Sequence, residues 1–564
     1  NTTLQTVIDI KGDSLKIKDT GLFVKNGSST EEIIGIDGTI TKLNTENPSI
    51  NLIKLKMPKE ITASLVVFPQ SKLTAKSSIF VSGDVKQPKI KGDLNISNMS
   101  IPELYITMKN AAAKFEGKDL DVDISGLIAN GSDFDILMNA DLTPSSDFVI
   151  RNLNLKSNLT DADKLMKVSD AAIKYTTPQT GASSSSSVSA QTNSDIPVII
   201  KDGSIDIKQI KSGGITLNET TGKISLAKNI FYLNNLVTTG FNGRISGNVA
   251  MNIVSGEIKA NVKGSGLDVE QTLSEAAGMK DTLTGTMDFD ANLSLKGATY
   301  EEQMKTLKGD VNFNMKDGSL GPVGKLENLV AADNIRSVAL LNSVAGGVLK
   351  STVDTSKYNT LKGHLTFSDG IAQINPITSA GDYMSAYIFG NFNILKNTAD
   401  MKLRGKLGSK ATASMGQLAA INPVNIVKSS SGMNIVLGSL LLKMCEQVSE
   451  DELNQIPDIA KESSAANFQI VINGDAAQPA KLIKSFKWLA LESDINEAKK
   501  ILSSTGNLTI PSNMDEVKQQ AKDLIKGLVS DGTGKTDDAE SQTLNTVKSL
   551  FGTTGTSEGT SFKD

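Results

Sequence analysis

Side chains that could do acid–base or nucleophilic chemistry are scarce in this chain. It has one histidine, His364, in the strand-like segment KGHLTFSDG, and one cysteine, Cys445. A serine-type triad needs histidine as its base, and histidine or thiolate metal sites need several such ligands. A single cysteine also cannot form an internal disulfide. We interpret His364 as an ordinary strand residue and expect no catalytic residues and no metal site.

The acidic segment DLDVDIS, residues 119–125, resembles the start of a calcium-binding loop. However, Ile124 stands where such a loop needs glycine, and Asn130 stands where it needs glutamate. Leucine, valine and isoleucine alternate with the aspartates, as they do in a strand with one acidic face. We therefore predict a strand here and not a calcium site.

The segment GTGKT, residues 532–536, resembles the end of a phosphate-binding loop. Val529 occupies the position of the first glycine that this loop requires, and no strand-like segment precedes it. We therefore expect no nucleotide and no other cofactor.

Charge is distributed evenly along the chain. The 58 basic and 62 acidic residues give a net charge of −4, and they are interleaved without a basic stripe. A nucleic-acid backbone requires such a stripe, so we expect no nucleic-acid partner. Scattered surface carboxylates also form no recognisable hydrolase pair, and we predict that the protein is not an enzyme.

Alternation of apolar and polar residues is the dominant pattern. It is clear in GTMDFDANLSLKG and KGDVNFNMKDGSL, where every second residue is apolar. This period of two places apolar side chains on one face of a strand and polar ones on the other. Asn, Pro and Gly recur between such runs, and the run MSAYIFGNFNILKNTADMKLRGKL reads as a hairpin around KNT. The sequence predicts a mainly β protein built as an antiparallel meander.

Short helices interrupt the predicted sheet. Helical spacing occurs at residues 160–175, 266–281 and 322–351, and Asp161 and Asp268 are suitable N-caps for the first two. We predict a β region over residues 1–175, a Ser-rich linker or disordered loop over 176–197, and a second β region with inserted helices over 198–410. A helix-rich cap with one strand pair near 467–473 is expected over 411–530, and a disordered tail over 531–564.

Residues 201–273 carry a DG-type hairpin (KDGSIDI), the turn NGRISG and the phrase GLDVEQTL. With residues 282–330 and 358–407, which follow in the same order, this region resembles the C-terminal part of AsmA-like bacterial envelope proteins, at about residues 201–407. GDVKQPKIKGDLNIS, at the start of residues 83–104, is similar to a phrase common in AsmA and TamB.

The resemblance implies an elongated, curved antiparallel sheet that forms an apolar, taco-like groove. It implies a non-enzymatic protein that shields lipid acyl chains, in phospholipid transport between membranes and outer-membrane biogenesis. The expected partners are phospholipid or another membrane lipid and proteins of the inner and outer membrane or envelope. The expected location is the periplasm, with anchoring to the inner membrane by an N-terminal helix that this chain does not include.

Candidate residues for the groove floor come from the alternating strands of the second β region. Alternatively, these residues are ordinary core packed against helices at 322–351 and 432–450. An alternative function is a scaffold or assembly factor for outer-membrane proteins that pairs client strands with an exposed sheet edge. The candidates are Val311, Phe313, Met315, Leu365, Phe367, Ile388 and Phe392.

Overall fold

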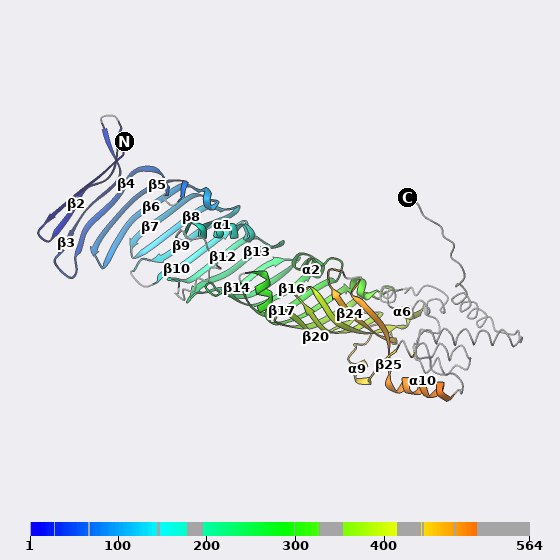
Figure 1. Ribbon diagram of the computed structural model, residues 1–564. Helices are drawn as coiled ribbons and strands as arrows, with labels where there is room; N and C mark the ends of the chain where they lie inside the picture. Colours follow the sequence, from blue (N-terminus) through cyan, green and yellow to red (C-terminus); the bar gives the residue numbers. More distant parts are fainter. Residues whose placement is uncertain are drawn as a thin grey trace, which may run out of the picture. The chain divides into compact units, whose positions relative to one another are not determined.

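The computed structural model confirms the mainly β, antiparallel prediction (Figure 1). Its described residues form 25 strands and a few short helices. They divide into two units, Asn1–Gly264 (unit 1) and Ser265–Asp564 (unit 2). The structure describes residues 2–26, 29–65, 68–143, 147–176, 196–297, 299–325, 353–413, 442, 445–478 and 481–504.

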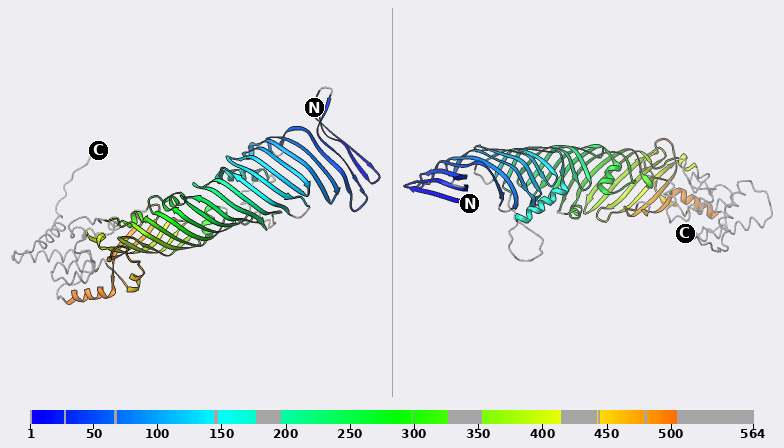
Figure 2. Two further views of the ribbon diagram at one scale, coloured as in Figure 1. Left: turned by 180° about the vertical axis from the view of Figure 1, so that it is seen from behind. Right: turned by 90° about the horizontal axis from the view of Figure 1, so that it is seen from above.

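Unit 1 is built from long strands that run side by side and bend together into a curved sheet (Figure 2). Its elements are β1 (Thr2–Lys11), β2 (Ser14–Asn26), β3 (Ser29–Thr41), β4 (Ser49–Leu65), β5 (Phe68–Asp84), β6 (Gln87–Ile101), η1 (Pro102–Leu104), β7 (Ile106–Gly117), β8 (Asp119–Ala129), β9 (Ser132–Asp141), β10 (Phe148–Ser157), β11 (Thr160–Asp161), α1 (Ala162–Thr176), β12 (Val198–Ser212), β13 (Ile215–Ala227), β14 (Ile230–Gly240) and β15 (Gly243–Asn252). Strand β16 (Glu257–Asp268) spans the sequence division between the units.

The strands of unit 1 form a meander with one parallel step. From β1 to β10 each strand pairs with the next in antiparallel register. Strand β10 then pairs with β12 in parallel register. A parallel pair needs a crossover connection, and α1 lies in it. The predicted helix at 160–175 is confirmed, and the Asp161 carboxylate accepts a hydrogen bond from the Lys164 amide at 3.0 Å.

The β8–β9 hairpin illustrates how the sequence specifies these turns. Asn130 and Gly131 have φ angles of 46° and 90°, a left-handed pair that glycine and asparagine adopt most easily. The Asn130 side-chain amide donates to the Lys164 carbonyl at 2.9 Å and so ties the hairpin to α1. The predicted strand at DLDVDIS is therefore β8, with its register fixed at the turn.

Unit 2 contains shorter strands with helices between them. Its elements after β16 are α2 (Val269–Ala277), β17 (Thr284–Lys296), α3 (Tyr300–Thr306), β18 (Lys308–Ser319), η2 (Gly321–Gly324), β19 (Lys357–Ser368), β20 (Ile371–Ala380), β21 (Met384–Asn393), β22 (Thr398–Gly408), α6 (Ser409–Thr412), β23 (Cys445–Val448), α9 (Glu450–Asn454), β24 (Ser464–Asp475), β25 (Ile483–Leu491) and α10 (Glu492–Ser504).

Antiparallel pairing links β17 through β22 in order, then β22 to β24 and β24 to β25. The β21–β22 hairpin around KNT is confirmed, as is the helix that Asp268 caps, where the aspartate accepts from the Gln271 amide at 2.9 Å. The short strand β23 adds in parallel beside β25. The strand pair predicted near 467–473 corresponds to β24 and β25.

Several predictions fall outside the described residues. They include most of the Ser-rich linker, most of the helix at 322–351, the helix at 432–450 apart from Leu442, and the tail at 531–564. The predicted domain boundaries stay predictions. Within the part of the chain that the structure describes, no helix has both the length and the apolar composition needed to cross a membrane.

Candidate functional site

One face of the unit 1 sheet is apolar across successive strands. Register partners on that face run from Leu94 on β6 through Ala113 on β7, Val122 on β8 and Met138 on β9 to Leu153 on β10. Each of these side chains has intermediate exposure. We call this surface the apolar face of unit 1. Partly exposed aliphatic side chains in a continuous row form a surface that can receive an apolar ligand.

Parallel rows widen the apolar face on both sides of that row. One of these rows runs through Ile124 and Ile136, and another runs through Leu120 and Ala140. Both lie on the same side of the sheet as Val122 and Met138. No cluster of fully buried hydrophobic residues within the described ranges includes a residue of unit 1. The further members of these rows are Ala75, Ile96, Ala111, Leu155 and Ile205, and Phe115, Ile150 and Ile200.

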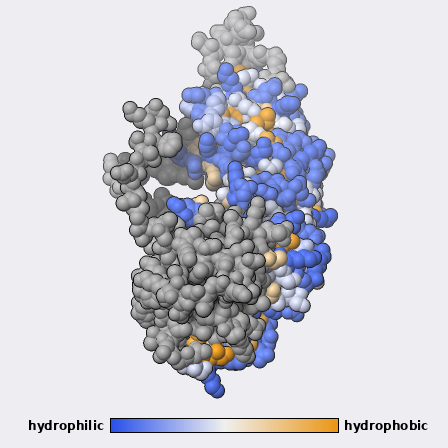
Figure 3. Space-filling model, turned by 90° about the vertical axis from the view of Figure 1, so that its right-hand side faces the viewer, coloured by the Kyte–Doolittle hydropathy of each residue, from blue (hydrophilic) through white to orange (hydrophobic). Residues whose placement is uncertain are grey.

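The opposite face of the same strands is polar. Asp93, Lys114, Asp121, Asn139 and Asn152 form its corresponding row. A shallow pocket of about 490 Å³ on this face is lined by such polar residues together with Ala112 and Leu137, and it also reaches Ala113, Val122 and Met138 of the apolar-face row. Figure 3 views the molecule from the right-hand side of Figure 1, and on that side most coloured residues are hydrophilic, with hydrophobic ones scattered between them. The polar face is therefore suited to solvent.

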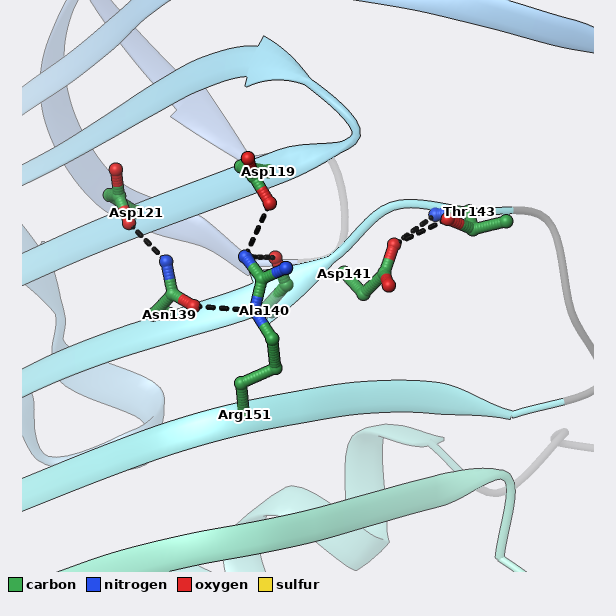
Figure 4. Close-up of polar contacts among 7 residues, drawn as sticks. All are labelled: Asp119, Asp121, Asn139, Ala140, Asp141, Thr143 and Arg151. Atoms are coloured by element: carbon green, nitrogen blue, oxygen red, sulfur yellow. Dashed lines mark hydrogen bonds and ion pairs between the residues drawn. The ribbon is translucent and has the colours of Figure 1, made fainter.

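A bulge in β10 places Arg151 on the polar face (Figure 4). Its guanidinium donates from Nη2 to Asp119 Oδ1 at 2.5 Å and from Nε to Asn139 Oδ1 at 2.7 Å. Asn139 in turn donates to Asp121 Oδ1 at 2.5 Å. Because the bulge adds one residue to β10 opposite β9, Arg151 and Asn152 lie on the same side of the sheet. The network joins β8, β9 and β10 across the polar face.

Asp141 ends β9 beside this network. Hydrogen bonds from the hydroxyl and amide of Thr143 lower the pKa of Asp141, and the charges of Lys118 and Arg151 lower it further. The carboxylate is therefore ionised at neutral pH and held by its own turn.

Unit 2 also has an apolar sheet face, but side chains of the same unit pack against that face and bury it. Leu403, Ile470 and Phe486 are register partners on one face, with exposures of 1%, 0% and 6%. Phe486 contacts the Trp488 ring edge-on at 4.7 Å between centroids. Gly405 lacks a side chain where the Phe468 ring packs, so the ring lies directly over the strand. This face is a packed core and not an open surface.

The predicted groove residues all lie on the core-bearing face of unit 2. Met315 is a buried member of the core, and Phe313, Ile388 and Phe392 pack against it. Val311, Leu365 and Phe367 are partly exposed on the same face. The helices that were expected to cover these residues lie almost wholly outside the described ranges, so their contact with a ligand stays a prediction.

The remaining chemically interesting side chains have structural surroundings. His364 on β19 lies on the polar side, with its Nε2 at 3.0 Å from Asp310 Oδ1. Burial raises the pKa of the Cys445 thiol to about 12, which keeps it protonated. Within the described ranges, no group of three or more histidine, cysteine, aspartate or glutamate residues could hold a metal ion.

Sequence reasoning did not select the apolar face of unit 1 as a site. Val122 and Met138 belong to alternating segments of the same kind as the selected ones. Alternation identifies which face is apolar, but it does not show whether other residues fill that face. That difference becomes visible only through the long-range pairing that creates the core of unit 2.

No protein-family model, curated protein sequence or solved structure matches this chain. The resemblance to AsmA-like proteins therefore supports only a proposal. The open apolar face of unit 1 is the feature from which we argue function.

Proposed function

We propose that this protein is a non-enzymatic lipid carrier that shields acyl chains on the apolar face of unit 1. The observation that supports this most directly is the continuous row from Leu94 to Leu153, whose side chains are apolar and only partly buried. The resemblance to AsmA-like envelope proteins points to the same function. On that basis we further propose phospholipid transport between membranes, outer-membrane biogenesis and a periplasmic location.

Energetics explain why such a surface would suffice. A phospholipid exposes on the order of 30 methylenes, each worth about 0.8 kcal/mol, so its transfer through water costs roughly 24 kcal/mol. A surface that covers the chains throughout removes most of this cost without any chemical step. Aliphatic side chains such as Val122 and Met138 would serve this purpose, because acyl chains need contact without directional bonding.

The dimensions of the strands also suit acyl chains. Strand β9 has 10 residues, and at ~3.4 Å per residue it is about 34 Å long. One leaflet's hydrocarbon layer is roughly 15 Å thick, half the thickness of a bilayer core. A lipid chain laid along the strands therefore fits on the apolar face.

The proposal can be tested by native mass spectrometry and lipid extraction on the full chain purified from a bacterium. The informative variant is Val122→Asp combined with Met138→Asp, which puts two carboxylates on the apolar face. The matched control is Leu137→Asp on β9, because Leu137 lies on the polar face and is 49% exposed.

We expect phospholipid to co-purify with the wild type and with Leu137→Asp, and to be lost from the double variant while its circular dichroism stays that of the wild type. A wild-type protein without lipid would contradict the proposal and favour the scaffold alternative. Equal lipid content in all three proteins would show that lipid binds elsewhere.

A further inference from the structure

Helix α1 lies beside the strand ends at one edge of the unit 1 sheet (Figure 1). It packs against β12 and against η1, the turn that joins β6 to β7. The strands between these two contacts are β7, β8, β9 and β10. The helix has 15 residues, and at ~1.5 Å per residue it is about 22 Å long. Strands lie about 4.8 Å apart, so this length is enough to cross the strands between the two contacts.

The chain enters α1 on the apolar side of the sheet. Ser132 and Phe134 alternate with polar residues along β9, in step with Met138, so these three side chains share one face. The amide of Asp161, the residue directly before α1, donates a hydrogen bond to Ser132 Oγ at 2.9 Å. Ser132 is fully buried. The start of α1 therefore covers the end of the apolar face of unit 1.

The outermost row of the apolar face is buried at this edge, and we call it the edge row. Ile101 and Ala129 in this row are each 7% exposed, and Leu104 on η1 is 9% exposed. In contrast, Val122 and Met138 in the central row are only partly buried. The apolar face is thus covered where η1 and α1 lie and open at its centre. The register partners that form the edge row are Ile101, Ile106, Ala129 and Ser132.

Helix α1 has one apolar side, and that side is only partly buried. Leu165, Val168 and Ala172 recur at helical spacing, and each has intermediate exposure. Met166, which does not belong to this stripe, is 61% exposed. No described residue of α1 belongs to a buried hydrophobic cluster. The apolar contacts of α1 therefore stabilise its position less than core packing would.

Two hydrogen bonds fasten the first turn of α1 to the sheet. The Asn130 side-chain amide donates to the Lys164 carbonyl at 2.9 Å, and Asp163 Oδ2 accepts from the Gly213 amide at 2.9 Å. Each such bond contributes only about 1 kcal/mol to stability. Local opening has a low free-energy cost where buried apolar contacts are few. Helix α1 can therefore detach while the strands beneath it stay paired.

We infer that α1 is an autoinhibitory flap, which covers the edge row when closed and frees that row for lipid acyl chains when it lifts. The inference rests on the proposed lipid-carrier function and concerns the regulation of the same surface. Acyl chains and the stripe of Leu165 and Val168 compete for the edge row, because both bind aliphatic side chains without directional bonds. Such coupling is reciprocal, so lipid binding lifts α1 and a loosened α1 raises the affinity for lipid.

The test measures amide hydrogen exchange of the full chain and its uptake of pyrene-labelled phosphatidylglycerol from phosphatidylglycerol vesicles at subsaturating lipid. Two variants loosen the flap. Asn130→Gly removes the amide that binds the Lys164 carbonyl, and glycine readily adopts the left-handed φ of 46° at this turn. Leu165→Ala shortens the apolar stripe and keeps a good helix former.

Each loosening variant has a matched control. Asn242→Gly changes the same kind of Asn–Gly turn, with φ of 59°, where the amide forms no hydrogen bond with the described residues of α1. Met166→Ala shortens an exposed side chain of the same helix. Unchanged hydrogen exchange in β8 and β9 identifies the variants whose sheet is intact.

We expect lipid uptake to speed hydrogen exchange in α1 of the wild type severalfold. Both loosening variants should exchange faster in α1 without lipid, and they should take up about two- to fivefold more lipid than the wild type. Both controls should behave as the wild type does.

Slower exchange in α1 after lipid uptake would overturn the inference, because α1 would then be a fixed wall of the lipid site. Unchanged exchange in α1 of both loosening variants, or faster exchange without a gain in lipid uptake, would also overturn it. These results leave the carrier function standing. No lipid uptake by the wild type or by any variant would overturn both.

Discussion

Leu137 and Met138 are neighbours on β9 that face opposite sides of the sheet. Leu137 pairs with Asp123 on the polar face and is 49% exposed, whereas Met138 pairs with Val122 on the apolar face. One peptide bond therefore separates a solvent-facing residue from one on the proposed lipid-binding surface. A substitution at one of these two positions can therefore change one face of the sheet and leave the other face unchanged.

Arg151 should stabilise unit 1 more than an ordinary surface cation does. Its side chain is 30% exposed and contacts both Asp119 and Asn139, so we expect Arg151→Gln to cost about 1 kcal/mol after allowance for solvent screening. Urea unfolding measures the change in the free energy of unfolding. The rate of amide hydrogen exchange should also rise locally in β8–β10.

Lys91→Gln is the control for this prediction. Lys91 and Glu116 are 71% and 54% exposed, so removal of their ion pair should cost less than about 0.5 kcal/mol. If both variants lost the same stability, the network around Arg151 would have no special role.

Trp488 should report the core of unit 2. It is the one tryptophan of the chain and is 1% exposed, so native fluorescence should be blue-shifted and poorly quenched by acrylamide. Trp488→Ala should destabilise unit 2 by about 3–5 kcal/mol. Trp488→Phe should cost less, because it removes a buried indole N–H without a hydrogen-bond partner in the described part of the chain. Strong acrylamide quenching of the native protein would contradict this placement.

Tyr358 should make unit 2 sensitive to alkali. Burial raises the pKa of Tyr358 to about 12 from its usual 10.0, and its hydroxyl donates to the Thr284 carbonyl at 2.5 Å. Between pH 10 and 12 the unfolded chain loses this proton while the folded chain keeps it, so stability falls as pH rises. Tyr358→Phe should be about 1 kcal/mol less stable than wild type at pH 8, because the hydrogen bond is lost.

The difference between wild type and Tyr358→Phe should shrink above pH 10, since the variant lacks the ionisable group. Chemical unfolding at pH 8 and pH 11 measures this difference. An unchanged difference at the two pH values would mean that the phenol ionises equally well in both states.

Phe313→Asp should destabilise unit 2, because Phe313 packs against its core and over Gly363. An unpaired carboxylate at this partly buried position, among core side chains, should cost several kcal/mol. Ile371→Asp on β20, two strands from Phe313, is the control, since Ile371 is 39% exposed and should tolerate the change. Thermal unfolding followed by tryptophan fluorescence distinguishes them, and equal melting temperatures would contradict the core assignment.

Local structure could be predicted well from the sequence because it depends on neighbouring residues. Alternation around Val122 predicted a strand, and Asp161 and Asp268 predicted the starts of helices that the structure confirms. Period-two alternation also placed Phe313 and Met315 on one face correctly. These features follow from backbone geometry and capping chemistry.

Burial of each face could not be predicted, because it depends on residues far apart in the sequence. The core around Leu403 forms only because β22 pairs with β24 and β24 with β25, which brings Trp488 across from Phe468. The alternation of apolar and polar residues is the same in strands whose apolar face is open and in strands whose apolar face is covered by other side chains. The bulge that places Arg151 on the polar face likewise depends on how β10 pairs with β9.

The most direct test of the lipid-carrier account is to crosslink a phospholipid with a photoactivatable acyl chain to the full protein and map the adducts by peptide mass spectrometry. The account predicts adducts on the apolar face of unit 1, at or beside Val122, Met138 and Leu153. Adducts confined to the core around Phe468, adducts spread over the polar face, or no adducts at all would contradict it.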